Sequence, residues 1–470
     1  MQPKWKQMIG TGRYIAFFSL FALFIVQDKL QDHITLFQYF DEGAALLFVP
    51  LLCWHLIRGS RMFNLTRENV LFFVSLAVFF SCGWAGHVLH GYQPLSAALK
   101  DAYVNMKFFL AAGAGYLLFY DGRSSRNRGP EAERETAFPF GELKRRLFPV
   151  LYGVSCLFFV LSILDAVFHI FSNDTRGGLP AVKLFYSAQT NLVGICVLLC
   201  AMLLWYWGED RTASENPLIQ NNRVLRYLRS LGVVVPLVLL SAVMFSTLRA
   251  KSVGAIACII LVCLFVLRRR EKPSRMMKIF FFAVLAFAAA AGIYQVFRYY
   301  YQMGMESARA VLTVAAPFVA WDHFPFGCGW ATFGSAFSGE PYSPVYGMYR
   351  MSGVWGLSPG WHQFVSDTYW PMVLAETGYF GLAALLCSLC MFARKIWRLR
   401  VHPASFASAL LPFLYLFISS TSESAFANPL AVPMAFWIGF LFAEYAASPV
   451  SAAQKCANAH KCANAKTSRT

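Results

Sequence analysis

The chain has 470 residues, of which 57% are hydrophobic and 17% aromatic, while only 14% are charged. A soluble globular protein carries about 25% charged residues, and apolar runs of 16 to 22 residues recur throughout this sequence. These features indicate a polytopic membrane protein, and they exclude a cytosolic enzyme, a secreted disulfide-rich domain and a disordered protein.

The apolar runs, taken in chain order, predict about twelve transmembrane helices in a single membrane domain, residues 1–470. The expected fold class is therefore an all-α polytopic integral membrane protein. The first run lacks a small-residue cleavage site and is interpreted as a span rather than a removable signal. The predicted spans are 13–27, 43–57, 69–86, 103–120, 148–171, 187–207, 231–248, 252–267, 279–297, 371–393, 404–420 and 429–446.

The formal net charge of +17 is distributed unequally between the two sides of these spans. Of the 41 Lys and Arg residues, 31 lie on the side of the N-terminus, nine on the other side, and Lys107 within a span. Because basic residues are retained in the cytoplasm, both termini and the basic loop 121–147 are expected there. The positive charge thus indicates topology and contact with membrane lipids, with no nucleic-acid partner.

The cysteines do not predict a disulfide framework, because most lie in or beside spans, where Cys behaves as a small hydrophobe. The tail 448–470 repeats Lys-Cys-Ala-Asn-Ala around His460. That spacing matches no common structural zinc site, so the tail is expected to be a disordered cytoplasmic segment without metal.

One connection is far longer than the rest. Residues 298–370, between the ninth and tenth spans, form a 73-residue segment rich in Gly, Pro, Trp and Tyr. This composition is too aromatic for a disordered linker, and a long ordered loop on a rigid scaffold is where a site is expected. We expect it to form an extracytoplasmic cap with short helices over a substrate, a passive lid being the alternative.

Basic residues are sparse on the outer side, so those present are candidate ligands for an anion. Arg249 and Lys251 lie between two short spans, and Arg309 begins an amphipathic stretch of the long loop. Arg176 and Arg298 complete the predicted cluster. Guanidinium groups bind phosphate through paired donors, which suits a diphosphate at the membrane surface. Snorkelling to lipid headgroups is the alternative for Arg249 and Lys251.

Several stretches, in order, resemble the O-antigen ligase and repeat-unit polymerase superfamily of bacterial envelope glycosyltransferases. The similarity spans about residues 170–390 and includes the placement of the long loop. The matching elements are Arg-Gly-Gly-Leu (176–179), Ser-Ala-Gln-Thr-Asn-Leu-Val-Gly (187–194), Ser-Thr-Leu-Arg-Ala (246–250), Arg309 with Phe-Pro-Phe-Gly-Cys-Gly-Trp (324–330), and Asp367-Thr368 followed after nine residues by Gly378-Tyr-Phe-Gly381.

The resemblance implies a GT-C-like membrane fold and transfer of a glycan from an undecaprenyl-diphosphate carrier, in the bacterial inner membrane with the active site on the periplasmic side. Where the ligases have a catalytic His, this chain has Asp367, and His362 lies five residues earlier. This departure favours a polymerase over a ligase that transfers glycan to lipid A-core. Asp367 or His362 would activate the acceptor hydroxyl, although Asp367 is also a plausible helix N-cap.

In this mechanism Arg249 and Arg309 would stabilise the departing diphosphate, and no metal or other cofactor is required. Aromatic residues of the long loop would stack on sugar faces, or alternatively belong to an interfacial belt. The candidates are Trp355, Trp361 and Tyr369.

Two alternatives from other classes remain open. Acidic residues in the first outer loop would suit a metal-dependent membrane glycosyltransferase, and twelve spans would suit a lipid-oligosaccharide flippase or transporter. The sequence contains no evident internal repeat of the kind transporters carry. The acidic residues are Asp28, Asp32, Asp41 and Glu42.

Overall fold

The computed structural model describes residues 2–58, 66–120, 138–207, 223–267 and 302–448, together with isolated positions between 279 and 297. Within these residues the regular structure is helical apart from one short hairpin, β1 (Thr175–Arg176) paired antiparallel with β2 (Leu179–Pro180). The first predicted tail residue, Ser448, is described, but residues 449–470 and most of the loop 121–147 lie outside the described residues.

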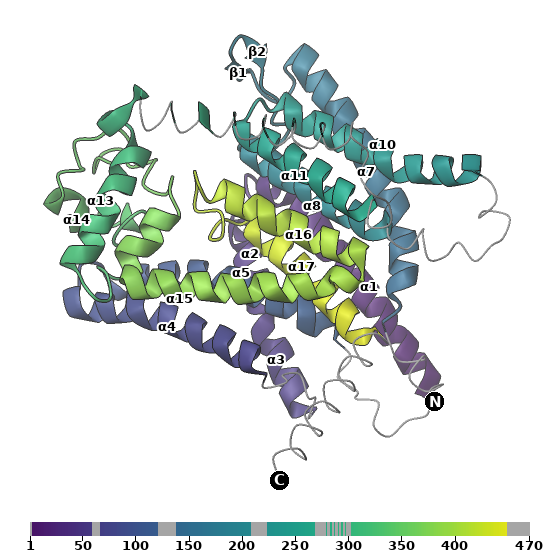
Figure 1. Ribbon diagram of the computed structural model, residues 1–470, viewed down its shortest axis with the longest axis horizontal. Helices are drawn as coiled ribbons and strands as arrows, with labels where there is room; N and C mark the ends of the chain where they lie inside the picture. Colours follow the sequence, from purple (N-terminus) through teal and green to yellow (C-terminus); the bar gives the residue numbers. More distant parts are fainter. Residues whose placement is uncertain are drawn as a thin grey trace.

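The helices form one bundle with a smaller group of elements at one end (Figure 1). Their bounds are α1 Gln2–Leu30, η1 Thr35–Tyr39, α2 Phe40–Leu46, α3 Phe48–Ile57, α4 Arg67–His90, α5 Leu95–Phe119, α7 Phe140–Phe168, α8 Gln189–Trp207, α10 Arg223–Ser246, α11 Ala250–Leu267, η5 Gly304–Glu306, α13 Ala308–Asp322, η6 Ala336–Ser338, α14 Pro344–Met348, α15 Trp370–Arg398, η7 Leu399–Val401, α16 Pro403–Ser419 and α17 Ala431–Ala447.

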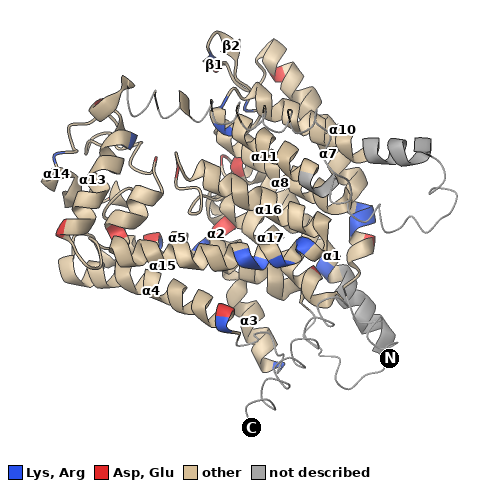
Figure 2. Ribbon diagram, viewed as in Figure 1, with Lys and Arg blue, Asp and Glu red and all other residues tan. Residues whose placement is uncertain are grey.

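Six helical segments in the described part of the chain are long and apolar enough to cross a membrane, and four shorter ones are similarly apolar. Figure 2 shows that charged residues are sparse along these helices. The protein is therefore an all-helical, multi-pass membrane protein. The long segments are Thr35–Ile57, Arg67–His90, Leu95–Phe119, Phe140–Phe168, Gln189–Trp207 and Trp370–Val401, and the shorter ones are Gly232–Ser246, Ala250–Leu264, Pro403–Ser419 and Ala431–Ala447.

Eleven of the twelve predicted spans coincide with helices in the described residues, while the ninth, 279–297, lies largely outside them. Several helices begin before the predicted span. Helix α5 begins at Leu95, eight residues before the predicted span. Asp101 interrupts the apolar run in the sequence, but its side chain is buried and bonded inside the protein, so it does not mark the end of the helix. Helix α7 begins at Phe140, eight residues before the predicted span, and includes the charged Lys144, which pairs with Glu444 of α17 at 3.0 Å.

Close helix packing in the bundle depends on small residues. Helix α17 crosses α5 so closely that a Cβ on Gly439 would lie 2.0 Å from the carbonyl oxygen of Ala112, and one on Gly115 would lie 2.1 Å from that of Phe436. Small residues permit this approach because helices in a membrane associate through backbone proximity and dispersion rather than through the hydrophobic effect.

Residues 302–370 form a cap beside the C-terminal end of α4 and the start of α15 (Figure 1). Its buried side chains include Leu312 and Val319 from α13, Tyr346 from α14, and Phe333 and Leu357 from the loops. These side chains form a core of their own, which holds the cap together as a folded unit. The N-terminal end of α1 and the C-terminal end of α17 lie at the end of the bundle opposite the cap (Figure 1).

Candidate functional site

The first pair of candidate cations lies where α10 turns into α11. Leu248 takes a left-handed backbone (φ 51°) in the turn between the helices. Arg249 donates from Nη2 to Oε1 of Gln189 at 2.8 Å, and the ammonium of Lys251 lies 2.9 Å from Oε2 of Glu423. The turn thus directs two cations toward carbonyl and carboxylate oxygens contributed by α8 and by the loop between α16 and α17.

The third cation comes from the cap. Arg309, the second residue of α13, places Nη2 2.9 Å and Nε 3.1 Å from the same oxygen, Oδ2 of Asp367. Asp367 lies just before α15, and both side chains are about three-quarters buried, at 20% and 27% exposure. The N-cap role considered for Asp367 is not seen, because Tyr369 is the N-cap residue and makes no side-chain cap bond.

These two ion pairs lie close enough to form one electrostatic cluster. Lys251 lies within Coulombic range of both Arg249 and Arg309, and Asp367 within range of both Lys251 and Glu423. The bundle and the cap therefore contribute three cations and two carboxylates to a single region, a net charge of +1. Cations held near a low-dielectric wall attract anions strongly, so a polyanion can replace the carboxylates as their partner.

The electrostatic surroundings of Asp367 act in opposite directions on its acidity. Burial raises its pKa above the usual value of 3.8, and Glu423 adds to this increase, while Arg309 and Lys251 oppose it. The net effect is a raised pKa. A carboxylate with a raised pKa is a stronger base than a solvated one, and its ion pair with Arg309 fixes its orientation.

Two further predicted cations are placed differently. Arg176 lies on the exposed strand β1 of the hairpin, and Arg298 lies outside the described residues. The hairpin nevertheless connects to the cluster: Asp174 pairs with Lys183 at 3.3 Å and accepts a hydrogen bond from Gln189 at 3.1 Å. Gln189 in turn binds Arg249.

His362 and the candidate aromatic residues lie in the cap. The Nε2 atom of His362 is 3.6 Å from a carboxylate oxygen of Glu340, which is itself a cap residue. Trp355 and Trp361 form an aromatic contact with centroids 4.2 Å apart, and the Trp355 side chain is 64% exposed. Both tryptophans belong to a surface cluster with Phe364.

Tyr369 requires a correction. The sequence predicted that its ring stacks on a sugar, but the residue is only 2% exposed. Its ring packs against Trp370 and Phe426, with centroids 5.3 and 5.5 Å away. Stacking on a sugar needs an accessible ring face, so Tyr369 is part of the core between α15 and the α16–α17 loop.

Two residues of the cluster, Glu423 and Gln189, were not among the residues predicted from the sequence. Gln189 stands inside the quoted Ser-Ala-Gln-Thr-Asn motif, and Glu423 is the acidic residue in the short connection between the last two spans. An outer loop that contains one acid and neither Lys nor Arg is a usable signal for a partner to an outer cation.

The motif Phe-Pro-Phe-Gly-Cys-Gly-Trp (324–330) fills a break in α15. Gly378 leaves the helical conformation (φ 68°, ψ −176°), which frees carbonyl groups of the preceding turn. The N–H of Cys328 donates to the carbonyl of Ala375, and that of Gly329 to the carbonyl of Glu376, both at 2.9 Å. A broken helix in a membrane is tolerated where protein satisfies its backbone.

Two buried carboxyl groups hold the next residues of this loop. Asp101 of α5 accepts the N–H of Ala331 at 2.7 Å, and Glu376 of α15 accepts the N–H groups of Thr332 and Phe333 at 2.9 and 3.1 Å. The two side chains also contact each other. Backbone N–H groups bind one oxygen of each acid, so the pair fixes the inner edge of the cap to the bundle.

The acidic residues of the first outer loop do not gather into one ligand set. Asp28 accepts bonds from Ser187 and Asn191, and Asp32 pairs with Lys29. Asp41 and Glu42 both face Lys107. In the part of the chain that the structure describes, no three His, Cys, Asp or Glu side chains are grouped to hold a metal ion.

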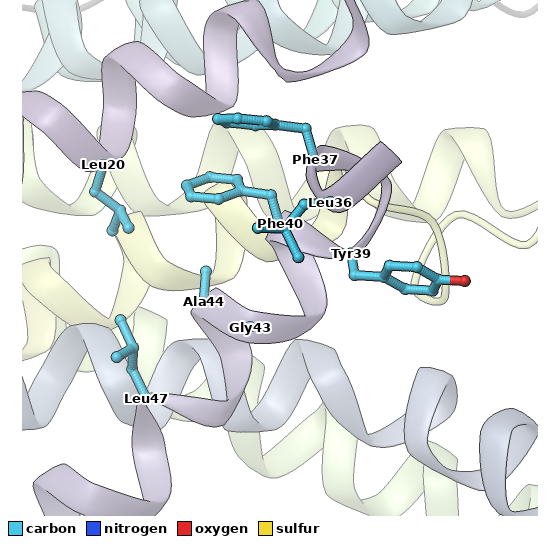
Figure 3. Close-up of a pocket in the computed structure, with 8 residues that line it drawn as sticks. All are labelled: Leu20, Leu36, Phe37, Tyr39, Phe40, Gly43, Ala44 and Leu47. Atoms are coloured by element: carbon cyan, nitrogen blue, oxygen red, sulfur yellow. The ribbon is translucent and has the colours of Figure 1, made fainter. Parts of the chain in front are cut away.

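An apolar pocket of about 360 Å³ lies between α1 and the η1–α2 segment (Figure 3). The Phe37 and Phe40 rings stack over one side of it, and the hydroxyl of Tyr39 points away. Its lining is Leu20, Leu36, Phe37, Tyr39, Phe40, Gly43, Ala44 and Leu47. With no charged group in its wall, this pocket suits hydrocarbon and not the polar part of a substrate.

Comparison with known proteins gives no assignment: no protein-family model matches the chain, and no curated protein matches it.

Proposed function

We propose that the protein is a membrane glycosyltransferase that uses an undecaprenyl-diphosphate-linked oligosaccharide, most specifically an O-antigen or exopolysaccharide repeat-unit polymerase. The observation that carries the proposal is the convergence of Arg249, Lys251 and Arg309 from the bundle and the cap. Three cations at a membrane surface match the charge of a lipid diphosphate, and a GT-C-like arrangement with twelve spans would place them on the periplasmic side of the bacterial inner membrane.

The reaction follows from these positions. The donor diphosphate would bind the three cations in place of Asp367 and Glu423, which pair with them in this structure. Asp367, released from Arg309, would take the proton of the acceptor hydroxyl as its oxygen attacks the anomeric carbon. The bond from that carbon to the diphosphate oxygen breaks, and lipid diphosphate leaves with its negative charge on the cations. No metal ion or other cofactor is called for.

The acceptor decides between a polymerase and a ligase. A polymerase would accept a second lipid-linked glycan, and a ligase would accept lipid A-core. We favour the polymerase because Asp367 occupies the position of the ligase His. Trp355 and Trp361, which contact each other on the cap surface, would stack on the sugars of either acceptor.

A flippase or transporter would share the broken helix α15, because discontinuous helices form many transport sites. In this protein the freed carbonyls of Ala375 and Glu376 bind the N–H groups of Cys328 and Gly329. A break that is filled by the protein's own backbone offers no ligands to a substrate, so this alternative gains no support from it.

The test is the glycan profile of a deletion strain complemented with single variants at equal membrane expression. We expect Arg249→Gln and Arg309→Gln to lower polymer synthesis about 10²- to 10³-fold each, the usual effect of removing one transition-state donor. Arg350→Gln is the matched control, because Arg350 is an exposed cap residue in a turn after α14. Single repeats on lipid A-core would indicate a polymerase, and a bare core with free lipid-linked polymer would indicate a ligase. A normal profile in the deletion strain would refute both.

A further inference from the structure

Helix α13 presents an uninterrupted apolar stripe to the outside of the protein. Val314, Phe318 and Trp321 follow each other at helical spacing and are 48%, 63% and 70% exposed. No charged residue occurs between Arg309 and Asp322 at the two ends of the helix. The opposite face is buried in the cap core through Leu312 and Val319, so the stripe is what remains unpartnered.

The stripe continues onto a helix that is expected to contact lipid. The ring of Trp321 contacts that of Phe324, which contacts Phe380 of α15, with centroids 6.4 and 5.8 Å apart. Phe380 is 54% exposed on a candidate membrane span. The hydroxyl of neighbouring Tyr379 donates to the carbonyl of Pro317 in α13 at 3.2 Å.

We propose that α13 is an interfacial helix whose Val314–Phe318–Trp321 face lies in the outer leaflet of the bilayer. Soluble surfaces rarely expose contiguous apolar patches of this kind. An amphipathic helix with Trp and Phe on one face inserts that face at the boundary between headgroups and acyl chains, and aromatic rings favour this level. The occupant is lipid, because the patch is continuous with the lipid-facing surface of α15.

The consequence is that the cap is partly immersed and not wholly solvated. It would bring Arg309, at the first turn of α13, to the level of the lipid headgroups. This inference does not depend on the proposed chemistry, because it rests on the exposed apolar side chains and their continuity with α15.

The test uses benzoylphenylalanine, a photo-crosslinking residue, introduced singly into the full chain in proteoliposomes of deuterated phosphatidylcholine. The test positions are Phe318 and Trp321. Leu157, 54% exposed on span α7, is the positive control for lipid contact. Met348, 55% exposed on α14 at the far edge of the cap in Figure 1, is the matched negative control.

After irradiation, mass spectrometry should find lipid adducts at positions 318 and 321 with yields within about threefold of that at 157, and at least tenfold above that at 348. Adducts to a second copy of the chain at 318 and 321 would overturn the proposal. So would adducts at 157 without any at 318 and 321, or equal yields at 348, which would mean unspecific contact of the whole cap with lipid.

Discussion

At the scale of single residues, Asp367 and His362 compete for the same role but lie in different surroundings. Asp367 accepts two bonds from Arg309 and lies in the field of Lys251 and Glu423. His362 has its Nε2 3.6 Å from a carboxylate oxygen of Glu340 and its Nδ1 within hydrogen-bond distance of the carbonyl of Pro359, both in the cap. The proton acceptor of the proposed reaction must lie beside the diphosphate, and this condition favours Asp367.

The first prediction compares these two residues. Asp367→Asn should reduce polymer synthesis about 10²- to 10⁴-fold, because removing a general base usually costs that much. His362→Ala should retain synthesis within about threefold. Polymer length and yield are measured by gel profile at matched membrane expression. If His362→Ala is inactive and Asp367→Asn retains synthesis, the general base is His362 and not Asp367.

The second prediction concerns the pH dependence. A base must be deprotonated to act, so activity should fall as pH drops through the pKa of Asp367, which burial raises above 3.8. Lys251 lowers that pKa and Glu423 raises it. Lys251→Gln should therefore move the acidic limb of the rate profile to higher pH, and Glu423→Gln should move it to lower pH. Opposite shifts are the readout, measured in proteoliposomes with purified lipid-linked donor. Two shifts in one direction would exclude Asp367 as the titrating group.

At the scale of elements, the break in α15 determines how the cap is attached. Gly378 combines φ 68° with ψ −176°, a region that is essentially restricted to glycine. A Cβ on Gly378 would also lie 2.5 Å from the carbonyl oxygen of Pro325. The loop and the broken helix therefore fit together only with glycine here.

The third prediction follows from this contact. Gly378→Ala should destabilise the protein by at least about 1–3 kcal/mol, the usual cost of such backbone strain, and should expose the cap to proteolysis. Gly153→Ala is the control, because Gly153 lies in α7 and a methyl group added there would have open space for 4 Å around it. Thermal unfolding in detergent and limited proteolysis are the measurements. Equal melting of the two variants would contradict the proposed attachment.

At the scale of the whole molecule, a buried ion pair links the first outer segment to the centre of the bundle. The ammonium of Lys107 on α5 lies 2.7 Å from Oδ2 of Asp41 on α2, with side chains 2% and 0% exposed. Gln27 of α1 donates to Oδ1 of Asp41 at 3.1 Å. Three helices therefore meet at one charge pair inside the protein.

The fourth prediction is a double-mutant cycle on this pair. Lys107→Met and Asp41→Asn should each cost about 3–5 kcal/mol, because each leaves a buried partner uncompensated. The double variant should lose clearly less than the sum of the two. In the control, Lys29→Met breaks a half-exposed pair with Asp32 and should cost less than about 1 kcal/mol. Unfolding in mixed micelles gives the free energies, and additive losses would show that the pair is not coupled.

The fifth prediction tests the orientation inferred from charge. A cysteine at Glu306 in the cap should react with a membrane-impermeant maleimide in intact spheroplasts, and a cysteine at Arg400 should react only after permeabilisation. Both positions are exposed, and labelling is measured against the parent chain, which has native cysteines. Labelling of position 400 in intact spheroplasts would show that the orientation is the reverse of the one inferred from charge.

The sequence by itself determined the class of protein and the place of most helices. Hydropathy is a local property of a segment, so spans such as 187–207 and 404–420 coincide with α8 and α16 within two residues. It also singled out Arg249, which lies between two short apolar runs, because a charge near an apolar run needs a partner, and Arg309, which begins an amphipathic stretch of the long loop. Asp367 became a candidate only through the family resemblance. The sequence placed the start of α5 too late, since hydropathy penalises Asp101 without regard to the bonds that satisfy it.

Only the tertiary structure decided which distant residues meet. The partner of Lys251 is Glu423, 172 positions later. The lone acid of its loop suggests that it pairs with a cation, but no local pattern indicates which one. Tyr369 and Trp355 are both aromatic residues near the end of the cap, yet one is buried and the other exposed. Burial depends on what packs against a side chain from the rest of the chain. Only the tertiary structure therefore distinguishes the face of α13 that the cap core covers from the apolar face that stays exposed.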